Sequence, residues 1–284
     1  MSAEGLIRVR ILGCGSSGGV PRADGDWGSC NPENPRNRRR RCSILLEKAS
    51  DLKALERGSS TRILVDTSPD LREQLIDAGS PVPDAIVYTH AHADQAHGID
   101  DIRAIVYRHQ ARITAYMNVS TRTDLFKRFG YIFETPPGSG YPPLLEARDL
   151  PERGRISIEG EGGAIELETF PVQHGNVVCA GLRFGPVAYT PDVSAIDQAG
   201  FDALQDVPLW ILDALREKPH PTHTHVGQSL DWLEQVRARY GILTNLHTDL
   251  DYDALSDRCP ENIEPAFDGM VVTIDAGTGK KFRT

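Results

Sequence analysis

The segment Tyr88-Thr-His-Ala-His-Ala-Asp94 constrains this chain more than any other, because it follows an apolar run at 84–88 that turn residues bound. Such a run predicts a buried strand. Side chains alternate faces along an extended segment, so His90 and His92 project on the same side of the strand end, and Asp94 follows in register. Two imidazoles and a carboxylate on one face suit a single divalent cation. The pattern therefore predicts a metal site rather than two surface histidines beside an acid.

Length and composition indicate a soluble globular protein. The chain has 284 residues, of which 39% are hydrophobic and 25% charged, so it can bury a substantial core. No apolar run approaches the roughly 18–20 residues that span a bilayer, so we expect no membrane association. The N-terminal residues lead directly into a strand without an apolar signal segment. We therefore expect a cytoplasmic protein.

Charge and cysteine usage argue against several classes of protein. The formal net charge of −9 disfavours general nucleic-acid binding, which relies on neutralising phosphates. Five cysteines are scattered without a Cys-x-x-Cys pair, so neither a disulfide framework nor a zinc ribbon is expected. Histidine is more informative, because eight of the nine histidines fall in four short stretches, at 90–97, 174, 220–225 and 247.

A glycine-rich loop, Gly13-Cys-Gly-Ser-Ser-Gly-Gly19, follows the first predicted strand at 6–12. It matches the dinucleotide fingerprint G-x-G-x-x-G, but that fingerprint needs a helix to begin at the glycines. Prolines and glycines between 19 and 37 prevent such a helix. We therefore expect a tight loop beside an active site, with Ser17 as a candidate substrate contact.

A basic cluster, formed by Arg36 and the run 38–41, stands out in this acidic chain. Such a cluster is often a solvated loop. The alternative is that one or two of these arginines attract an anionic substrate. The sequence leaves both interpretations open.

Other potential ligands also follow predicted strands. The strands at 164–170, 186–190 and 240–246 precede His174, Asp192 and His247, and the strand at 208–213 precedes a loop with His220, His223 and His225. Asp192 taken alone would be a cap for the helix expected near 196–205. Asp66, at the end of the strand at 61–66, is a turn cap or an outer orienter of a metal-bound histidine.

The order of elements predicts the fold class. Two groups of strands, at 6–89 and 155–213, are separated by helices expected at 99–112 and 120–130 and by a long loop at 134–154. Further helices are expected at 226–240 and near 251–257. Two packed sheets with helices outside fit this order.

Together these motifs resemble the metallo-β-lactamase superfamily over nearly the whole chain. The matching residues are Asp66, His90, His92, Asp94, His174, Asp192 and His247. The resemblance implies an α/β four-layer αββα sandwich with two mixed sheets and outer helices, as one domain over 1–284. It places His90, His92 and His174 on one cation, Asp94 and His247 on a second, and Asp192 between them. The cofactor would be zinc or manganese, one or two per chain.

Within the superfamily, the glycine loop and the histidine-rich loop resemble the cyclic-phosphate phosphodiesterases of phosphonate breakdown. His225 matches the histidine that those enzymes place near the scissile phosphate, so the resemblance implies Asp94, His223 and His225 as catalytic groups. His223, His225 and Ser17 would contact the substrate. One departure is Gln95, which stands where members usually carry a histidine for the second cation. A carboxamide is a poorer ligand than imidazole, and His97 is a candidate replacement.

The leading hypothesis is therefore a metal-dependent phosphodiesterase that acts on a small cyclic phosphate or a nucleotide-like phosphodiester through a metal-activated hydroxide. A second is another hydrolase of the same fold: a thioesterase, a lactonase or a tRNA-processing nuclease. A third, suggested by Gln95, is a metal-poor protein that binds a phosphorylated ligand without turnover. The oligomeric state stays open, with a homodimer among the options.

Overall fold

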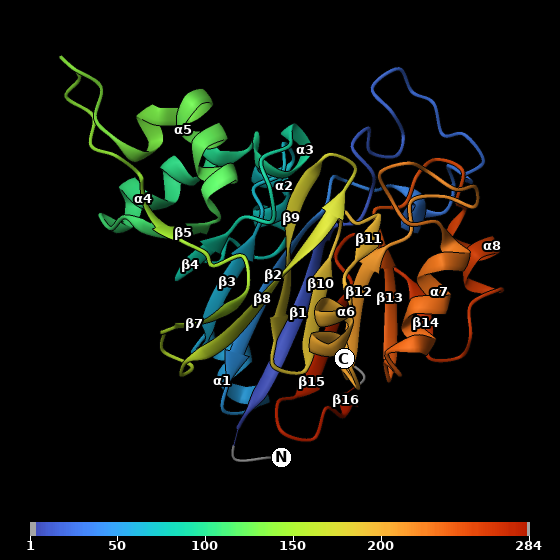
Figure 1. The fold of residues 1–284 in the computed structure, drawn as a ribbon. Helices are drawn as coiled ribbons and strands as arrows, with labels where there is room; N and C mark the ends of the chain where they lie inside the picture. Colours follow the sequence, from blue (N-terminus) through green and yellow to red (C-terminus); the bar gives the residue numbers. More distant parts are fainter. Residues whose placement is uncertain (1–3, 283–284) are drawn as a thin grey trace.

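The computed structural model describes residues 4–282 and contains two facing β-sheets with helices on their outer sides (Figure 1). The first sheet has the strand order β16-β15-β1-β2-β3-β4-β5-β6. Strands β3 to β6 are parallel, and the remaining neighbours are antiparallel. The strands are β1 (Leu6–Gly13), β2 (Ser43–Ala49), β3 (Thr61–Val65), β4 (Ala85–Val87), β5 (Ile113–Met117), β6 (Leu145–Asp149), β15 (Val271–Asp275) and β16 (Lys281–Phe282).

The second sheet has the order β11-β8-β9-β10-β12-β13-β14, and β7 also pairs with β8. Strands β10, β12, β13 and β14 are parallel, while β7, β8, β9 and β11 pair in antiparallel fashion. The strands are β7 (Gly154–Ile158), β8 (Ile165–His174), β9 (Val177–Phe184), β10 (Val187–Thr190), β11 (Ala195–Ile196), β12 (Leu209–Asp213), β13 (Tyr240–Thr244) and β14 (Ile263–Pro265).

Helices cover the outer face of each sheet (Figure 1). The helices connected with the first sheet are α1 (Leu52–Arg57), α2 (Leu71–Asp77), α3 (Ala93–Ala96), η2 (Ile99–Ile102), α4 (Arg103–His109) and α5 (Val119–Phe133). Those connected with the second are α6 (Gln198–Leu204), α7 (Val226–Gln235) and α8 (Tyr252–Ser256), and η1 (Pro35–Asn37) lies in the loop after β1.

Three hydrophobic cores hold these layers together. One lies between the sheets, and the other two lie between each sheet and its helices. Strand β2 contains the continuous apolar run 44–46, because both of its faces are buried there: Ile44 and Leu46 belong to the core between the sheets, whereas Leu45 belongs to the core beneath the helices. Strands buried on both faces lose the usual alternation of polar and apolar residues. The predicted four-layer sandwich is confirmed.

The parallel strands bring their following residues to one edge of the sandwich. In the second sheet Thr190 pairs with Leu212, and Asp213 pairs with Thr244. In the first sheet Val65 pairs with Val87. Residues that follow these strands in the sequence therefore become neighbours in space. This is the edge on which ligands bind in open α/β sheets.

Some elements differ from the expectation. The loop predicted at 134–154 contains the edge strand β6, in which only Leu145 is buried, so its apolar signal is weak. The helix predicted at 226–240 already ends at Gln235. Helices α1 and α2 and strand β5 were not predicted. None of the helices in the described part of the chain has the length and apolar content to cross a bilayer.

Candidate metal centre and its cavity

A cavity of about 670 Å³ lies at the edge where the strands end. Histidines, carboxylates, arginines and the glycine loop contribute to its wall. The lining residues are Ser16, Ser17, Gly18, Arg22, His92, Asp94, His174, Asn176, Val177, Asp192, Leu215, Arg216, His220, Thr222, His223, Asn245 and His247. The glycine loop and Ser17 thus border the cavity, as predicted.

His90, His92 and His174 form a compact group, the histidine triad. Their ring centroids are 4.5 to 5.4 Å apart, and one ligand nitrogen of each lies within 4.8 Å of the others. His90 and His92 follow β4, and His174 is the last residue of β8. The structure thus brings together residues that are more than 80 positions apart in the sequence.

In His90 and His174 a hydrogen bond occupies Nδ1, which leaves Nε2 of each ring available to bind a cation. His174 Nδ1 lies 2.7 Å from the Thr222 carbonyl oxygen, so this nitrogen carries the proton and Nε2 is the ligand atom. His90 Nδ1 lies 3.1 Å from Thr89 Oγ1, and the buried Nε2 has no hydrogen-bond partner. A buried nitrogen without a partner is costly unless a ligand satisfies it. The triad therefore fits a divalent cation.

Asp66 supports this arrangement from behind. Its carboxylate accepts hydrogen bonds from Thr89 N and Thr89 Oγ1, both at 2.8 Å, and the same hydroxyl contacts His90. Of the two roles open for Asp66, the orienting one fits these contacts, although it acts through Thr89 rather than directly on the histidine. Burial raises the pKa of Asp66 to about 8.

Burial also lowers the pKa of His90 and of His174, which favours their neutral forms. It lowers the pKa of His90 well below the ordinary value, and the neighbouring His92 and His174 lower it further. Burial lowers the pKa of His174 to about 4, despite the opposing hydrogen bond to Thr222. Neutral imidazole is the form that binds a cation.

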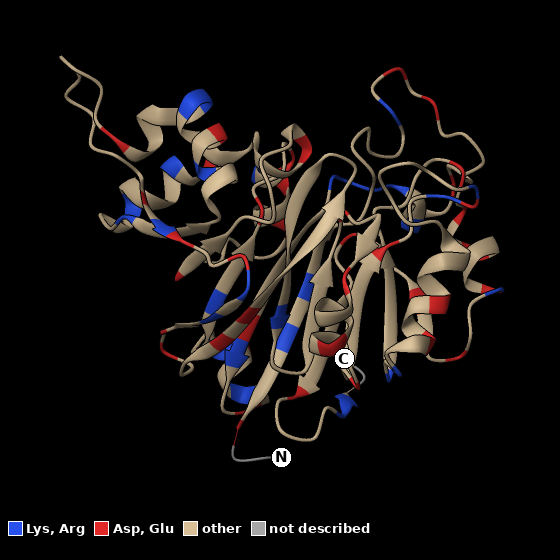
Figure 2. Ribbon diagram, viewed as in Figure 1, with Lys and Arg blue, Asp and Glu red and all other residues tan. Residues whose placement is uncertain are grey.

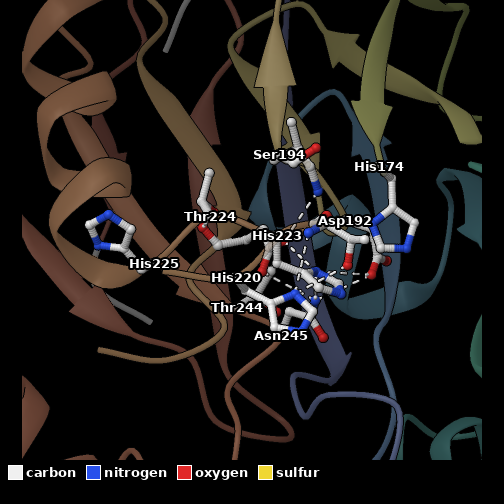
Figure 3. A network of polar contacts seen from close by, with 12 residues as sticks. His174, Asp192, Ser194, His220, His223, Thr224, His225, Thr244 and Asn245 are labelled. Atoms are coloured by element: carbon white, nitrogen blue, oxygen red, sulfur yellow. Dashed lines mark hydrogen bonds and ion pairs between the residues drawn. The ribbon is translucent and has the colours of Figure 1, made fainter. Parts of the chain in front are cut away.

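Beside the triad lies a polar group, which we call the amide end, formed by Asp192, Asp213, Gln95 and Asn245. Asp192 and Asn245 line the cavity and are labelled in Figure 3. Gln95 Nε2 donates to Asp192 Oδ2 at 2.9 Å, and Asn245 Nδ2 donates to Asp192 Oδ1 at 3.2 Å and to Asp213 Oδ1 at 3.1 Å. Burial, and then the neighbouring Asp94 and Asp213, raise the pKa of Asp192 well above its usual range. The cap of helix α6 is Asp197, so Asp192 does not serve as the helix cap that it would be as a lone residue.

His223 lies beside the amide end. Its Nδ1 is 2.7 Å from Asp213 Oδ2, and its ring is 4.5 Å from that of His174. His174, Asp192 and His223 form the second group of potential metal ligands among the described residues. His220 lines the cavity too, but its Nδ1 contacts Thr222 within the same loop, so this ring supports the loop conformation.

The structure places two of the predicted site histidines outside both groups of potential ligands. His225 is the N-cap of helix α7, where its side chain accepts from Gln228 N, and Figure 3 shows it apart from the polar network. It does not line the cavity. His247 does line it, but its Nε2 contacts the Arg22 guanidinium, and the ring is outside both groups of potential ligands. The side chain that approaches Asp192 is Asn245, two residues earlier.

His97 does not replace the histidine missing at position 95. It is exposed, contacts Arg128 and packs against the Phe129 ring on α5. Gln95 by contrast is buried and contacts Asp192.

The residues of the basic cluster are not among those that line the cavity. Figure 2 shows these basic residues in the loop between β1 and β2. Arg40 pairs with Asp77 and Asp268, Arg41 pairs with Asp70, and Arg39 is buried. The cavity arginines of the described chain are Arg22 and Arg216 instead, which sequence reasoning did not single out.

Asp213 and Asn245 were also missed, although a signal existed. Asp213 is the last residue of β12, and Asn245 directly follows β13. The position at a strand end that identified Asp66 and Asp192 applies equally to them. Arg22 and Arg216 lie in loops without such a signal.

Comparison with known proteins decides the family. The sequence model described as "Beta-lactamase superfamily domain" matches residues 61–247, which include the triad and the amide end. This chain is a metallo-β-lactamase superfamily member. A crystal structure described as a new diphosphatase from the PhnP family is 32% identical, with a TM-score of 0.83, and the match covers 95% of this chain and 97% of that one. The superfamily member is accordingly a metal-dependent hydrolase close to the PhnP family.

The chain is also similar to two further proteins. Zinc-bound PqqB from Methylobacterium extorquens shares the fold, with a TM-score of 0.65 at 15% identity over 94% of this chain and 99% of that chain. A curated octanoyltransferase of Porphyromonas gingivalis (strain ATCC BAA-308 / W83) is 29% identical over 272 residues, which is 95% of this chain and 52% of the relative. The chain therefore spans about half the length of that relative.

Proposed function

We propose that this superfamily member hydrolyses a phosphodiester or diphosphate bond in a small phosphorylated molecule. The observation that carries the proposal is that the histidine triad shares one cavity with Arg22, Arg216 and His223. A volume of about 670 Å³ suits a nucleotide-sized ligand. The similarity to a diphosphatase of the PhnP family supports the same class of substrate.

The cation site would be formed by the histidine triad, and three imidazole nitrogens favour zinc, with manganese as the alternative. A bound cation would lower the pKa of a water molecule and withdraw charge from phosphoryl oxygens. Asp94 lines the cavity beside the triad and supplies a carboxylate that can accept a proton.

His223 is suited to protonate the leaving oxygen. Its Nδ1 donates to the buried Asp213 carboxylate, which leaves Nε2 as the ring nitrogen available to a ligand and stabilises the imidazolium form. The Asn245 amide donates to Asp192 and Asp213, which keeps their carboxylate oxygens oriented. His223 in this role replaces His225 of the sequence-based assignment.

Arg22 and Arg216 would hold the negative phosphoryl oxygens. Arg22 is exposed at the cavity and contacts His247, while Arg216 donates to the carbonyl oxygens of Lys218 and Pro219, which keeps its guanidinium at the rim. Guanidinium groups bind phosphate oxygens with two parallel hydrogen bonds. Ser16 and Ser17 add hydroxyl donors on the glycine loop.

An acyl substrate is the main competitor, because the curated relative is named octanoyltransferase. An octanoyl chain needs an apolar wall to bury it. Among the described residues that line the cavity, Val177 and Leu215 have the only large apolar side chains. The lining therefore favours a charged substrate.

A substrate panel tests the proposal. The zinc- and manganese-loaded protein is assayed with bis-p-nitrophenyl phosphate, a 2′,3′-cyclic nucleotide, a nucleoside diphosphate, an octanoyl thioester and a lactone. We expect turnover of the phosphoryl compounds. Turnover of the thioester or lactone alone would overturn the assignment.

Paired arginine variants make the panel sharper. Arg22→Ala should raise KM for the phosphoryl substrate by about tenfold, which corresponds to about 1.4 kcal/mol, with a smaller change in kcat. Arg38→Ala, which removes an exposed arginine outside the cavity lining, is the matched control and should leave KM unchanged. Equal effects of the two variants would show that general charge, rather than the cavity, attracts the substrate.

A further inference from the structure

We propose that this enzyme holds a single cation, on the histidine triad, and that Gln95 and Asn245, the amide pair, take the place of a second. This departs from the two-cation site that the superfamily resemblance implies. The proposal concerns only the number of cations, so it does not depend on which bond the enzyme hydrolyses.

The amide pair occupies both oxygens of the carboxylate that would lie between two cations. Gln95 Nε2 lies 2.9 Å from Asp192 Oδ2, and Asn245 Nδ2 lies 3.2 Å from Asp192 Oδ1. An amide NH₂ group has two donors and no lone pair to offer a cation. Both oxygens of Asp192 therefore already accept a hydrogen bond from a protein amide.

The contacts determine the orientation of both amides. Asn245 Nδ2 also lies 3.1 Å from Asp213 Oδ1, so rotating this amide would place its oxygen against two carboxylate oxygens. Rotating Gln95 would likewise set its oxygen against Asp192. Amide orientation is assigned from such networks, and here the carboxylates accept only the donor groups.

The second group of potential ligands does not form an independent site. It contains His174, Asp192 and His223, and His174 also belongs to the triad. His174 Nδ1 is committed to the Thr222 carbonyl oxygen, so this residue has one nitrogen for one cation. His223 Nδ1 is likewise committed to Asp213. Among the described residues, the triad alone combines three nitrogen ligands with an unpartnered buried nitrogen, His90 Nε2.

The amides also supply what a second cation would otherwise provide. Asp192, Asp213 and Asp94 cluster at this end of the cavity, and buried carboxylates of like charge need donors or cations. The two NH₂ groups stabilise Asp192 and Asp213 without a metal. The same contacts thus exclude the second cation and remove the need for it.

The test counts bound ions without relying on turnover. Metal-free protein is loaded with Mn²⁺ or Zn²⁺, and the bound ion is measured by plasma mass spectrometry and by Mn²⁺ electron paramagnetic resonance. We expect one equivalent per chain and the spectrum of an isolated Mn²⁺ ion. Two tightly held equivalents, or the spectrum of a spin-coupled pair, would overturn the proposal. Failure of the phosphodiesterase assignment would leave the count at one.

Variants test the amide pair directly. The double variant Gln95→His/Asn245→His should bind a second equivalent and give the coupled spectrum. The matched control Gln235→His/Asn262→His adds two imidazoles at exposed positions and should stay at one equivalent. A second equivalent in both variants, or in neither although both fold, would contradict the role of the amide pair. The wild-type count decides the proposal even if the double variant does not fold.

Discussion

The histidine triad and the amide end lie in the same cavity, but their polar atoms are satisfied in different ways. At the triad, His90 Nε2 is buried without a partner, and the hydrogen bond of His174 is on the side away from its ligand nitrogen. At the amide end, both oxygens of Asp192 accept hydrogen bonds from protein groups. The triad therefore offers a buried ring nitrogen to a ligand from outside the chain, whereas at the amide end both Asp192 oxygens are satisfied by protein donors and only the Gln95 amide oxygen is buried without a partner.

This difference teaches that potential ligands near one another are not yet a metal site. Asp and His side chains commonly bind cations, but here neighbouring groups already form hydrogen bonds with the Asp192 oxygen and with His223 Nδ1. A cation must displace those hydrogen bonds before it gains its own. What distinguishes the two ends is whether the atoms that bind a cation best, the imidazole nitrogens and carboxylate oxygens, are still free of protein donors.

The largest expected effect comes from removing a triad ligand. His90→Ala should abolish cation binding and lower kcat/KM on the order of 10³-fold or more, since a cation supplies several kcal/mol of transition-state stabilisation. Ion content and kinetics are measured on the same preparation. His97→Ala, seven residues later and beside Arg128, is the control and should retain both. If the His90 variant still bound the cation, the triad would not be the cation site, and the proposed difference between the two ends would be wrong.

The next effect concerns proton transfer at the amide end. His223→Ala should lower kcat by about 10²–10⁴-fold, the usual contribution of a general acid. The loss should be smaller for an aryl ester than for an alkyl ester, because an aryl oxide leaves without a proton. Asp213→Asn should lower kcat, because it weakens the contact that orients the His223 ring, while bound ion stays unchanged.

His225→Ala is the control for that prediction. It removes the cap of α7 and should cost roughly 0.5–2 kcal/mol of stability, with kcat unchanged. If the His225 variant loses activity as the His223 variant does, His225 would keep the catalytic role that the family resemblance implies for it.

The sequence was sufficient to predict the fold and the triad because both depend on local signals. His90 and His92 stand at alternate positions directly after a buried strand, and His174 is the last residue of another strand. Their positions at strand ends therefore follow from strand geometry. Parallel pairing then places strand ends side by side. No knowledge of loop conformation is needed for these predictions.

The remaining assignments depended on loops that distant contacts shape. His223 rather than His225 enters the cavity because Asp213 binds its Nδ1, while helix α7 begins directly after His225. At the end of β13, a left-handed residue, Asn245 with φ of 61°, turns towards Asp192. A search for imidazole ligands selects His247 and overlooks the amide. Arg22 reaches His247 across 225 residues, so nothing in its local sequence predicts the contact.

The smallest expected effect concerns the pH dependence of stability at the support behind the triad. There the pKa of the Asp66 carboxyl and the pKa of His174 are shifted in opposite directions. The pKa of Asp66 is raised from 3.8 to about 8, so the folded protein binds a proton that the unfolded chain releases. The contribution of Asp66 to stability is present below about pH 4 and lost as the pH rises through 8. The pKa of His174 is lowered from 6.5 to about 4, so its contribution is present above pH 6.5 and lost as the pH falls through 4.

Asp66→Asn separates these two contributions in the cation-free protein, because it removes the carboxyl and keeps the histidines. Relative to wild type, the Tm of the variant should rise by several degrees between pH 5 and pH 9, as wild type loses the contribution of its protonated carboxyl. Asp197→Asn is the control with the opposite sign: the Gly200 N–H lowers the pKa of that exposed cap, so its difference should arise only as the pH falls below about 4. Parallel Tm curves for the Asp66 variant and wild type would mean that Asp66 is ionised throughout. In that case a charged carboxylate, rather than a neutral acid, holds Thr89 behind the triad.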